Sequence, residues 1–253
     1  MKQYKNVNEL LHGSTRHGVQ ITASAELRKL PTAYFGETGG GLVFRHHRKY
    51  AGGEPVRFGG IGLGIGVLAA YGREGDVFRF YEISPEVIKV AENREWFTFL
   101  SDCAATLEIV EGDARKALEL EAMEDAPKYD IFVVDAFSGD SIPMHLITSE
   151  AFDLYRRRLA DNGILAVHIS NWQFDLFPLL KAQMQRMGMH GVGTIGNGEK
   201  AKVTEISYWA FFTEAPLAIG PSSKQVEIVD WDAVEDKPLI SDACGSLLPF
   251  LDN

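Results

Sequence analysis

Apolar runs of strand length alternate with segments of helical spacing from residue 56 onward. Strands are predicted at residues 56–61, 78–83, 107–110, 129–135, 163–169 and 206–212. The run 129–135 is nearly all apolar, which is typical of a strand covered on both faces. Alternation of strands and helices of this kind predicts an α/β fold with a mainly parallel sheet and helices on both of its faces.

Capping residues mark where several helices begin and end. Ser84 can cap a helix that begins at Pro85, since proline is favoured at the first helical position. Thr148 can cap a second helix that runs to residue 159, and Gly188 is a typical helix stop. Further helices are predicted at residues 67–71, 114–122 and 174–187.

The first 50 residues have a different pattern. Short alternating pieces around Gly13 and Gly18 predict a β-hairpin within residues 11–21. We therefore expect a small N-terminal β domain over residues 1–50 and a larger α/β domain over residues 51–253. The chain beyond Pro216 has little pattern until residue 247.

Composition, cysteine content and net charge limit where the protein is expected to act and which partners it is expected to bind. The 253 residues are 45% hydrophobic, which is ample for a core, and no apolar run is long enough to span a membrane. The two cysteines, Cys103 and Cys244, are far apart in sequence and no signal peptide precedes them, so we expect a cytoplasmic protein. A net charge of −10 argues against nucleic acid or anionic membranes as partners. It suits a small cationic substrate, although acidity also simply keeps proteins soluble.

A glycine-rich run follows the first strand of the larger domain. Gly62, Gly64 and Gly66 alternate between this strand and the helix predicted at residues 67–71. Glycine permits backbone angles that side chains forbid and lets a ligand approach the main chain. Such runs also occur in ordinary loops, so the residues that follow decide the interpretation.

Three acids follow successive strands. Glu82, Asp113 and Asp135 each come at the end of a predicted strand, where ligands of parallel sheets collect. Any one of them could be a helix cap or a solvated loop acid. Together they predict a binding edge that disfavours phosphates and favours a ligand with a ribose, an adenine and a positive charge, such as S-adenosylmethionine or its decarboxylated form.

The chain resembles the polyamine aminopropyltransferases, the spermidine synthase family. The matching pieces are residues 62–66, 81–83, 112–114, 133–135 and 168–180, and Gln20 lies in a stretch similar to the family's small β domain. The resemblance implies a Rossmann-like class I methyltransferase fold with a seven-stranded sheet. It also implies a transferase of polyamine biosynthesis that moves an aminopropyl group from decarboxylated S-adenosylmethionine to putrescine or a similar amine.

The same resemblance implies residue roles. Asp135 becomes the acid at the reacting amine, Glu82 binds the ribose, Asp113 the adenine edge and Gln20 the sulfonium side. The expected donor-binding set also includes Gly62, Gly64, Gly66 and Ala114, and the expected acceptor-binding set is Tyr34, Ser138, Asp140 and His145. Two positions depart from the family, because Gly64 and Ser138 stand where it carries aspartates; Asp140 follows two residues after Ser138.

Other interpretations stay open. A methyltransferase acting on a small molecule would use the same pocket, and a catalytically silent nucleoside-binding domain would need no acceptor. His168 lies within an apolar strand and is interpreted as a core residue, whereas His17 is interpreted as a turn or surface residue. No set of side chains has metal-ligand spacing, so no metal is expected. A homodimer is left open.

Overall fold

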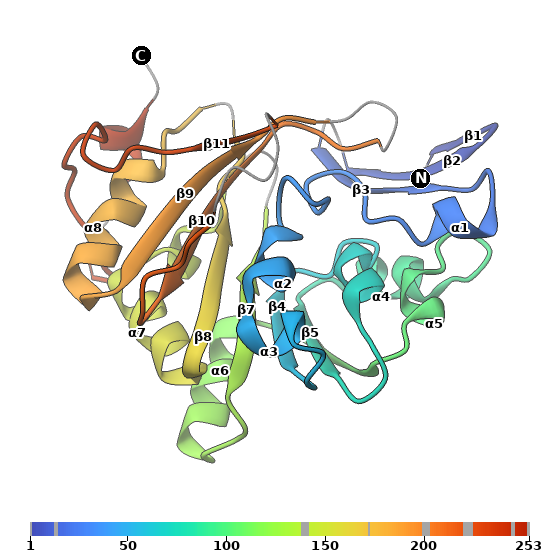
Figure 1. Ribbon diagram of the computed structural model, residues 1–253, viewed down its shortest axis with the longest axis horizontal. Coiled ribbons are helices and arrows are strands. Elements are labelled where there is room, and N and C mark those ends of the chain that lie inside the picture. Colours follow the sequence, from blue (N-terminus) through green and yellow to red (C-terminus); the bar gives the residue numbers. More distant parts are fainter. Residues whose placement is uncertain are drawn as a thin grey trace.

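The computed structural model describes residues 2–12, 15–137, 142–171, 173–198, 203–219, 225–243 and 246–251. These residues form a three-stranded sheet and an eight-stranded sheet. Figure 1 shows the small sheet beside one end of the large one, with the N-terminus on the small sheet and the C-terminus at the opposite side of the molecule.

The small sheet is antiparallel and contains a β-bulge. It consists of β1 (Lys2–Tyr4), β2 (Val7–His12) and β3 (Thr15–Ile21), in that order. Leu10 pairs with Gly18, but Leu11 pairs with Arg16, so His17 is the extra residue of β3. Bulges redirect the side chain of the extra residue, and this one turns His17 toward the pocket described below.

The large sheet has the order β11-β9-β10-β8-β7-β4-β5-β6. Its parallel strands are β4 (Arg57–Ile61), β5 (Val77–Glu82), β6 (Thr106–Glu111), β7 (Tyr129–Val134) and β8 (Leu159–His168). The antiparallel part consists of β10 (Ser207–Thr213), β9 (His190–Gly196) and β11 (Val226–Ile228). The mainly parallel α/β architecture is confirmed, with eight strands in the described residues rather than seven.

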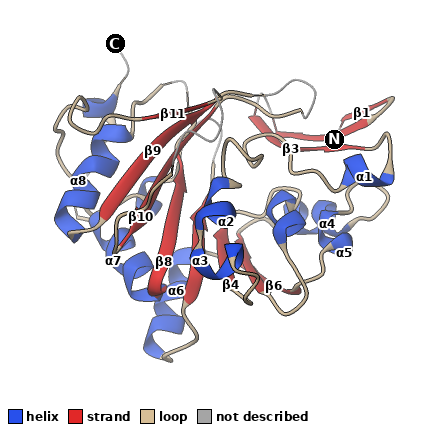
Figure 2. Cartoon of the chain, in the orientation of Figure 1, coloured by secondary structure: helices blue, strands red, loops and turns tan. Residues whose placement is uncertain are grey.

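Helices cover both faces of this sheet, as Figure 2 shows. Their bounds are α1 (Ala25–Arg28), α2 (Leu42–His46), α3 (Arg48–Ala51), α4 (Pro85–Glu92), α5 (Phe99–Asp102), α6 (Ala114–Met123), α7 (Ser149–Arg158) and α8 (Phe177–Met187). Short 3-10 turns are η1 (Val67–Tyr71), η2 (Met144–Leu146) and η4 (Leu248–Phe250). The segment after the glycine run is therefore a short 3-10 helix, Val67–Tyr71, with Gly72 as its C-cap, and not an α-helix.

The predicted helix boundaries are confirmed at three places. The Ser84 hydroxyl accepts from the Val87 N–H at 3.3 Å, and the Thr148 hydroxyl accepts from the Ala151 N–H at 3.3 Å. Gly188 ends α8 with a left-handed φ of 63°. These local signals depend on residue type alone, because each cap satisfies backbone groups that a helix end leaves unpaired.

Two apolar layers enclose the sheet. Phe132 and Val134 of β7 pack in the layer that includes α6, α7 and α8, while Ile131 and Val133 pack in the layer that includes α2, η1 and α5. Phe44 of α2 stacks on Phe78 of β5 at 5.9 Å between ring centroids, so the first 50 residues contribute to the second layer. The proposed boundary near residue 50 stays a prediction. Across the part of the chain that the structure describes, no helix has the length and apolar character needed to cross a membrane.

Candidate functional site

Backbone hydrogen bonds hold the carboxyl ends of four parallel strands in one row. The Asp135 N–H donates to the Ile61 carbonyl at 2.9 Å, and the Gly62 N–H donates to the Tyr81 carbonyl at 2.9 Å. The Gly112 N–H donates to the carbonyl of Glu82 at 2.8 Å. The loops after β7, β4, β5 and β6 therefore open at a common edge, where ligands of such sheets bind.

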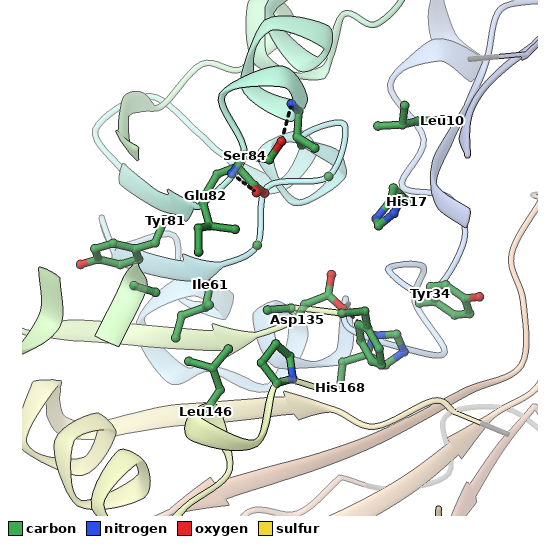
Figure 3. Close-up of a pocket in the computed structure, with 18 of the residues that line it drawn as sticks. Leu10, His17, Tyr34, Ile61, Tyr81, Glu82, Ser84, Asp135, Leu146 and His168 are labelled. Atoms are coloured by element: carbon green, nitrogen blue, oxygen red, sulfur yellow. Dashed lines mark hydrogen bonds and ion pairs between the residues drawn. The ribbon is translucent and has the colours of Figure 1, made fainter. Parts of the chain in front are cut away.

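A cavity of about 1040 Å³ lies at this edge. Glycine-loop, strand-end and helix-start residues line it from the large sheet, and Leu10, Arg16 and His17 line it from the small one. Figure 3 shows Glu82 at the left of the cavity, Asp135 and His168 at its base, and His17 and Tyr34 at its right. This volume is sufficient for a nucleoside-sized ligand together with a second small molecule.

The glycine run adopts conformations that require glycine. Gly62, Gly64 and Gly66 have φ values of 92°, 54° and 79°. A Cβ on Gly62 would collide with the main-chain carbonyl of Asp135, and one on Gly64 would lie 2.6 Å from the carbonyl oxygen of His17. Gly62 and Gly64 line the cavity, whereas Gly66 packs against Leu100 and does not line it.

The Glu82 carboxylate is fixed by two main-chain donors. The Leu63 N–H donates to it at 3.0 Å, and the Ser84 N–H donates at 2.9 Å. Glu82 therefore ties the glycine loop to the end of β5 and still lines the cavity. Each carboxylate oxygen keeps lone pairs for a further donor, such as a ribose hydroxyl.

Asp113 is both a helix cap and a cavity-lining residue, the two interpretations that the sequence allowed. Its side chain caps α6 by accepting from the Lys116 N–H at 3.1 Å, and the residue also lines the cavity. Ala114, the first residue of α6, lines the cavity beside it. Its small side chain leaves the start of the helix open to a ligand.

Asp135 and His168 form a direct contact at the base of the cavity. His168 Nδ1 lies 2.5 Å from Asp135 Oδ1; the carboxylate side chain is 18% exposed and the histidine 2%. Figure 3 shows the two side chains next to one another, with the carboxylate projecting into the cavity. His168 is buried, as its apolar strand indicates, and it is also a site residue. The register of β7 and β8 explains this, because Val134 pairs with Val167 and the next residues share one edge.

Tyr34 and His145 also line the cavity. The Tyr34 ring lies 4.8 Å from the His168 ring, between centroids. His145 lies in η2, and its carbonyl accepts from Arg115 at 3.0 Å. The remaining expected acceptor residues, Ser138 and Asp140, lie outside the described residues.

The expectation for Gln20 requires correction. Its side chain is 1% exposed and does not line the cavity. The amide nitrogen donates to the Thr98 hydroxyl and to the Arg28 carbonyl, both at 3.0 Å, and the amide oxygen accepts from the Thr98 N–H at 3.0 Å. A buried amide must be satisfied internally, and Gln20 thus joins the small sheet to the start of α5.

Two residues at the mouth of the cavity were missed by sequence reasoning. Arg16 pairs with Glu9 and with Glu205, and both Arg16 and Glu205 line the cavity. Glu205 reaches this position because its N–H donates to the Ala33 carbonyl at 3.1 Å. No periodicity or motif predicts the Arg16–Glu205 contact, since it joins β3 to a loop far away in sequence.

The described lining of the cavity is acidic. Its carboxylates are Glu82, Glu86, Asp113, Asp135 and Glu205, against one guanidinium, that of Arg16. Tyr81 also lines the cavity, but its hydroxyl donates to Glu121 of α6 at 2.7 Å. Burial, followed by the neighbouring Tyr129, raises the pKa of the Tyr81 phenol, so it remains protonated. Within the described residues no group of three or more His, Cys, Asp or Glu side chains could hold a metal ion.

Comparison with solved structures identifies the fold. A probable spermidine synthase from Corynebacterium glutamicum ATCC 13032 superposes with a TM-score of 0.59 and 14% identity, covering 90% of both chains. Human methyltransferase-like protein 13, solved in complex with SAH, superposes with a TM-score of 0.52 and 17% identity, over 71% of this chain and 82% of that one. The chain has the class I methyltransferase fold. At these identities the likeness concerns the methyltransferase fold alone.

Sequence comparison supports the expected resemblance. A curated polyamine aminopropyltransferase of Vibrio vulnificus (strain CMCP6) is 31% identical over 119 residues, which are 46% of this chain and 38% of that protein. The match thus spans well under half the length of the relative. No family model matches the chain. The chain is similar to polyamine aminopropyltransferases, as its glycine run and strand-end acids indicate, and it carries this similarity on a methyltransferase fold.

Proposed function

We propose that this protein transfers an aminopropyl group from decarboxylated S-adenosylmethionine to a small amine such as putrescine. The observation that carries the proposal is the Asp135 carboxylate, which faces an acidic cavity next to the glycine run. The curated relative, a polyamine aminopropyltransferase, supports the reaction class. The proposed donor site consists of Gly62, Gly64, Glu82, Asp113 and Ala114.

The proposed reaction is a single displacement. The amine nitrogen attacks the methylene carbon beside the sulfonium; a C–N bond forms, the C–S bond breaks, and its electron pair goes to sulfur in methylthioadenosine. The nitrogen then carries one proton too many, which passes to Asp135. Much of the rate comes from holding the amine in line with the C–S bond, and the acidic lining favours cationic reactants over anionic ones.

A second candidate function has one observation in its favour. The His17 carbonyl occupies the space where a side chain on Gly64 would begin, so this site cannot carry the glycine-loop aspartate that the resemblance leads one to expect. A methyltransferase that uses S-adenosylmethionine does not need that aspartate. The same pocket would then pass a methyl group to the acceptor and release S-adenosylhomocysteine.

Product analysis separates these functions. The protein is incubated with each donor and putrescine; methylthioadenosine marks aminopropyl transfer, and S-adenosylhomocysteine marks methyl transfer. Donor binding without either product would contradict both and indicate a nucleoside-binding domain.

Asp135→Asn tests the proposed base. We expect turnover to fall by about a hundred-fold to ten-thousand-fold, the usual contribution of a positioned general base. Asp102→Asn, which changes an exposed carboxylate of α5 that does not line the cavity, is the matched control. Equal turnover in the two variants would show that Asp135 is not the base.

A further inference from the structure

A chain of hydrogen bonds runs from the main chain of β10 to Asp135. The Tyr208 N–H donates to the Ser170 hydroxyl oxygen at 2.8 Å. Ser170 Oγ lies 2.7 Å from His168 Nε2, and His168 Nδ1 lies 2.5 Å from Asp135 Oδ1. Three side chains from the ends of β7 and β8 are thereby joined in series at the cavity.

The direction of these bonds follows from the proposed role of Asp135, because a carboxylate that takes up a proton can only accept hydrogen bonds. His168 then donates from Nδ1, its neutral ring accepts at Nε2, and Ser170 Oγ, which accepts from the Tyr208 N–H with one lone pair, gives its own proton to that nitrogen. An imidazole that accepts at Nε2 carries its proton at Nδ1 when neutral. That proton then points at Asp135 Oδ1, and the ionised carboxylate accepts it.

Aromatic rings hold the imidazole in place. Trp209 stacks on it at 4.5 Å with 14° between the planes, and Phe137 meets it edge-on at 5.0 Å. Tyr34 contacts the ring from the cavity side, at 4.8 Å between centroids. With only 2% of the side chain exposed, the ring has no room to turn away from Asp135.

We propose that His168 is a positioning residue that holds the Asp135 carboxylate aimed at the acceptor amine, and that Ser170 sets the tautomer that makes this possible. The part of this inference that concerns turnover rests on the proposed function. Oδ1 is held by the imidazole N–H, which leaves Oδ2 to take the proton of the attacking amine. No proton has to leave the imidazole during the reaction, so the step balances with Asp135 alone as acceptor.

The same three side chains stand in the order of a serine hydrolase, in which the hydroxyl attacks a carbonyl carbon and the imidazole takes its proton. Here the carboxylate, as well as the hydroxyl, faces the cavity, and Tyr208 already donates to Ser170 Oγ. We therefore assign the serine a structural partner role. Covalent labelling of Ser170 by a fluorophosphonate would overturn this assignment.

The tautomer is measurable without any substrate. Nitrogen NMR of the whole protein with labelled histidine should show one neutral ring protonated at Nδ1, and His168→Asn should remove that signal from among the seven histidines. If the signal that His168→Asn removes belongs to a ring protonated at Nε2, or at both nitrogens, the proposal is overturned. This result stands whether or not the protein turns over either donor.

Kinetics test the role itself with two variants of similar size. His168→Asn keeps an amide N–H near the position of Nδ1, whereas His168→Leu removes the donor. With the donor that the wild type uses, we expect His168→Leu to lose about a hundred-fold in kcat with little change in KM, because the base is misplaced and not the substrate. His168→Asn should recover most of that loss. Wild-type kcat in His168→Leu would overturn the inference, whereas absent turnover in the wild type would refute the proposed function alone.

Discussion

Gly64 shows how one backbone position determines which side chains the site can carry. Its φ of 54° lies in the left-handed region, and the His17 carbonyl comes within 2.6 Å of the place of its Cβ. The bulge in β3 brings His17 this close. The absence of an aspartate here is therefore a property of how the small sheet docks on the loop, and a single substitution cannot undo it.

Gly64→Asp should therefore destabilise the protein and not create a donor contact. We expect a loss of about 2–3 kcal/mol in the free energy of unfolding, part from the positive φ and part from the clash with His17. Gly53→Asp is the matched control, since Gly53 has a φ of 79° with nothing within 4 Å of its Cβ. Urea unfolding of both variants separates the two parts; equal losses would contradict the clash.

At the scale of elements, residues 240–242 dock on the start of α7. The Ser149 N–H donates to the Ile240 carbonyl at 2.8 Å. The Asp242 carboxylate accepts from Arg115 at 2.6 Å and from the Thr148 hydroxyl at 2.7 Å, and Thr148 is the cap of α7. A negative charge at a helix N-terminus is favourable. This contact links residues 240–242 to α6 and α7. Arg115 also donates to the His145 carbonyl at 3.0 Å, so the contact lies next to the loop that carries His145.

Replacing Asp242 should show how its contribution to the free energy of unfolding depends on pH. The hydrogen bond from Arg115 lowers the pKa of Asp242 below its ordinary value. Its contribution is therefore complete above the unfolded pKa, near 4, and is lost as the pH falls through the folded value. We expect Asp242→Asn to cost at most about 1 kcal/mol at pH 7, since the pair is partly exposed.

The measurement is urea unfolding of the wild type and Asp242→Asn between pH 2 and 7. The difference between the two stabilities should begin to shrink as the pH falls below about 4 and should vanish below the folded pKa of Asp242. Asp236→Asn is the control, because Asp236 is 82% exposed and pairs only at the surface with Lys181. A difference that persists unchanged at pH 2 would contradict the assigned pKa direction.

Local signals predicted most elements and left out those that depend on distant partners. The parallel strands and the caps at Ser84 and Thr148 follow from residue type and spacing. Strand β9 was missed because its sequence, residues 190–196, contains three glycines and no alternation. Likewise, loop contacts make Glu205 a lining residue of the cavity. Gln20 does not line the cavity, because Thr98 satisfies its side-chain amide. Such outcomes depend on packing between segments that no local pattern records.

For the molecule as a whole, the sheet is what brings the chemistry together. Acids separated by more than 50 residues in sequence, Glu82 and Asp135, line one cavity because their strands β5 and β7 flank β4. The small sheet closes that cavity from the other side through Arg16 and His17. The cavity is therefore lined from both sheets. The negative charge of its lining acts on an approaching ligand before any direct contact forms.

The most direct test of the central claim is calorimetry with S-adenosylmethionine and with its decarboxylated form. The account predicts that both bind one to one, without a strong preference, because Gly64 provides no carboxylate for the decarboxylated donor. Glu82→Gln should weaken both by about tenfold or more, the effect of losing a charged hydrogen bond. Glu92→Gln, an exposed change on α4, should not alter either affinity. No binding of either donor, or equal affinities in wild type and Glu82→Gln, would contradict the claim that these strand-end carboxylates bind an adenosyl sulfonium.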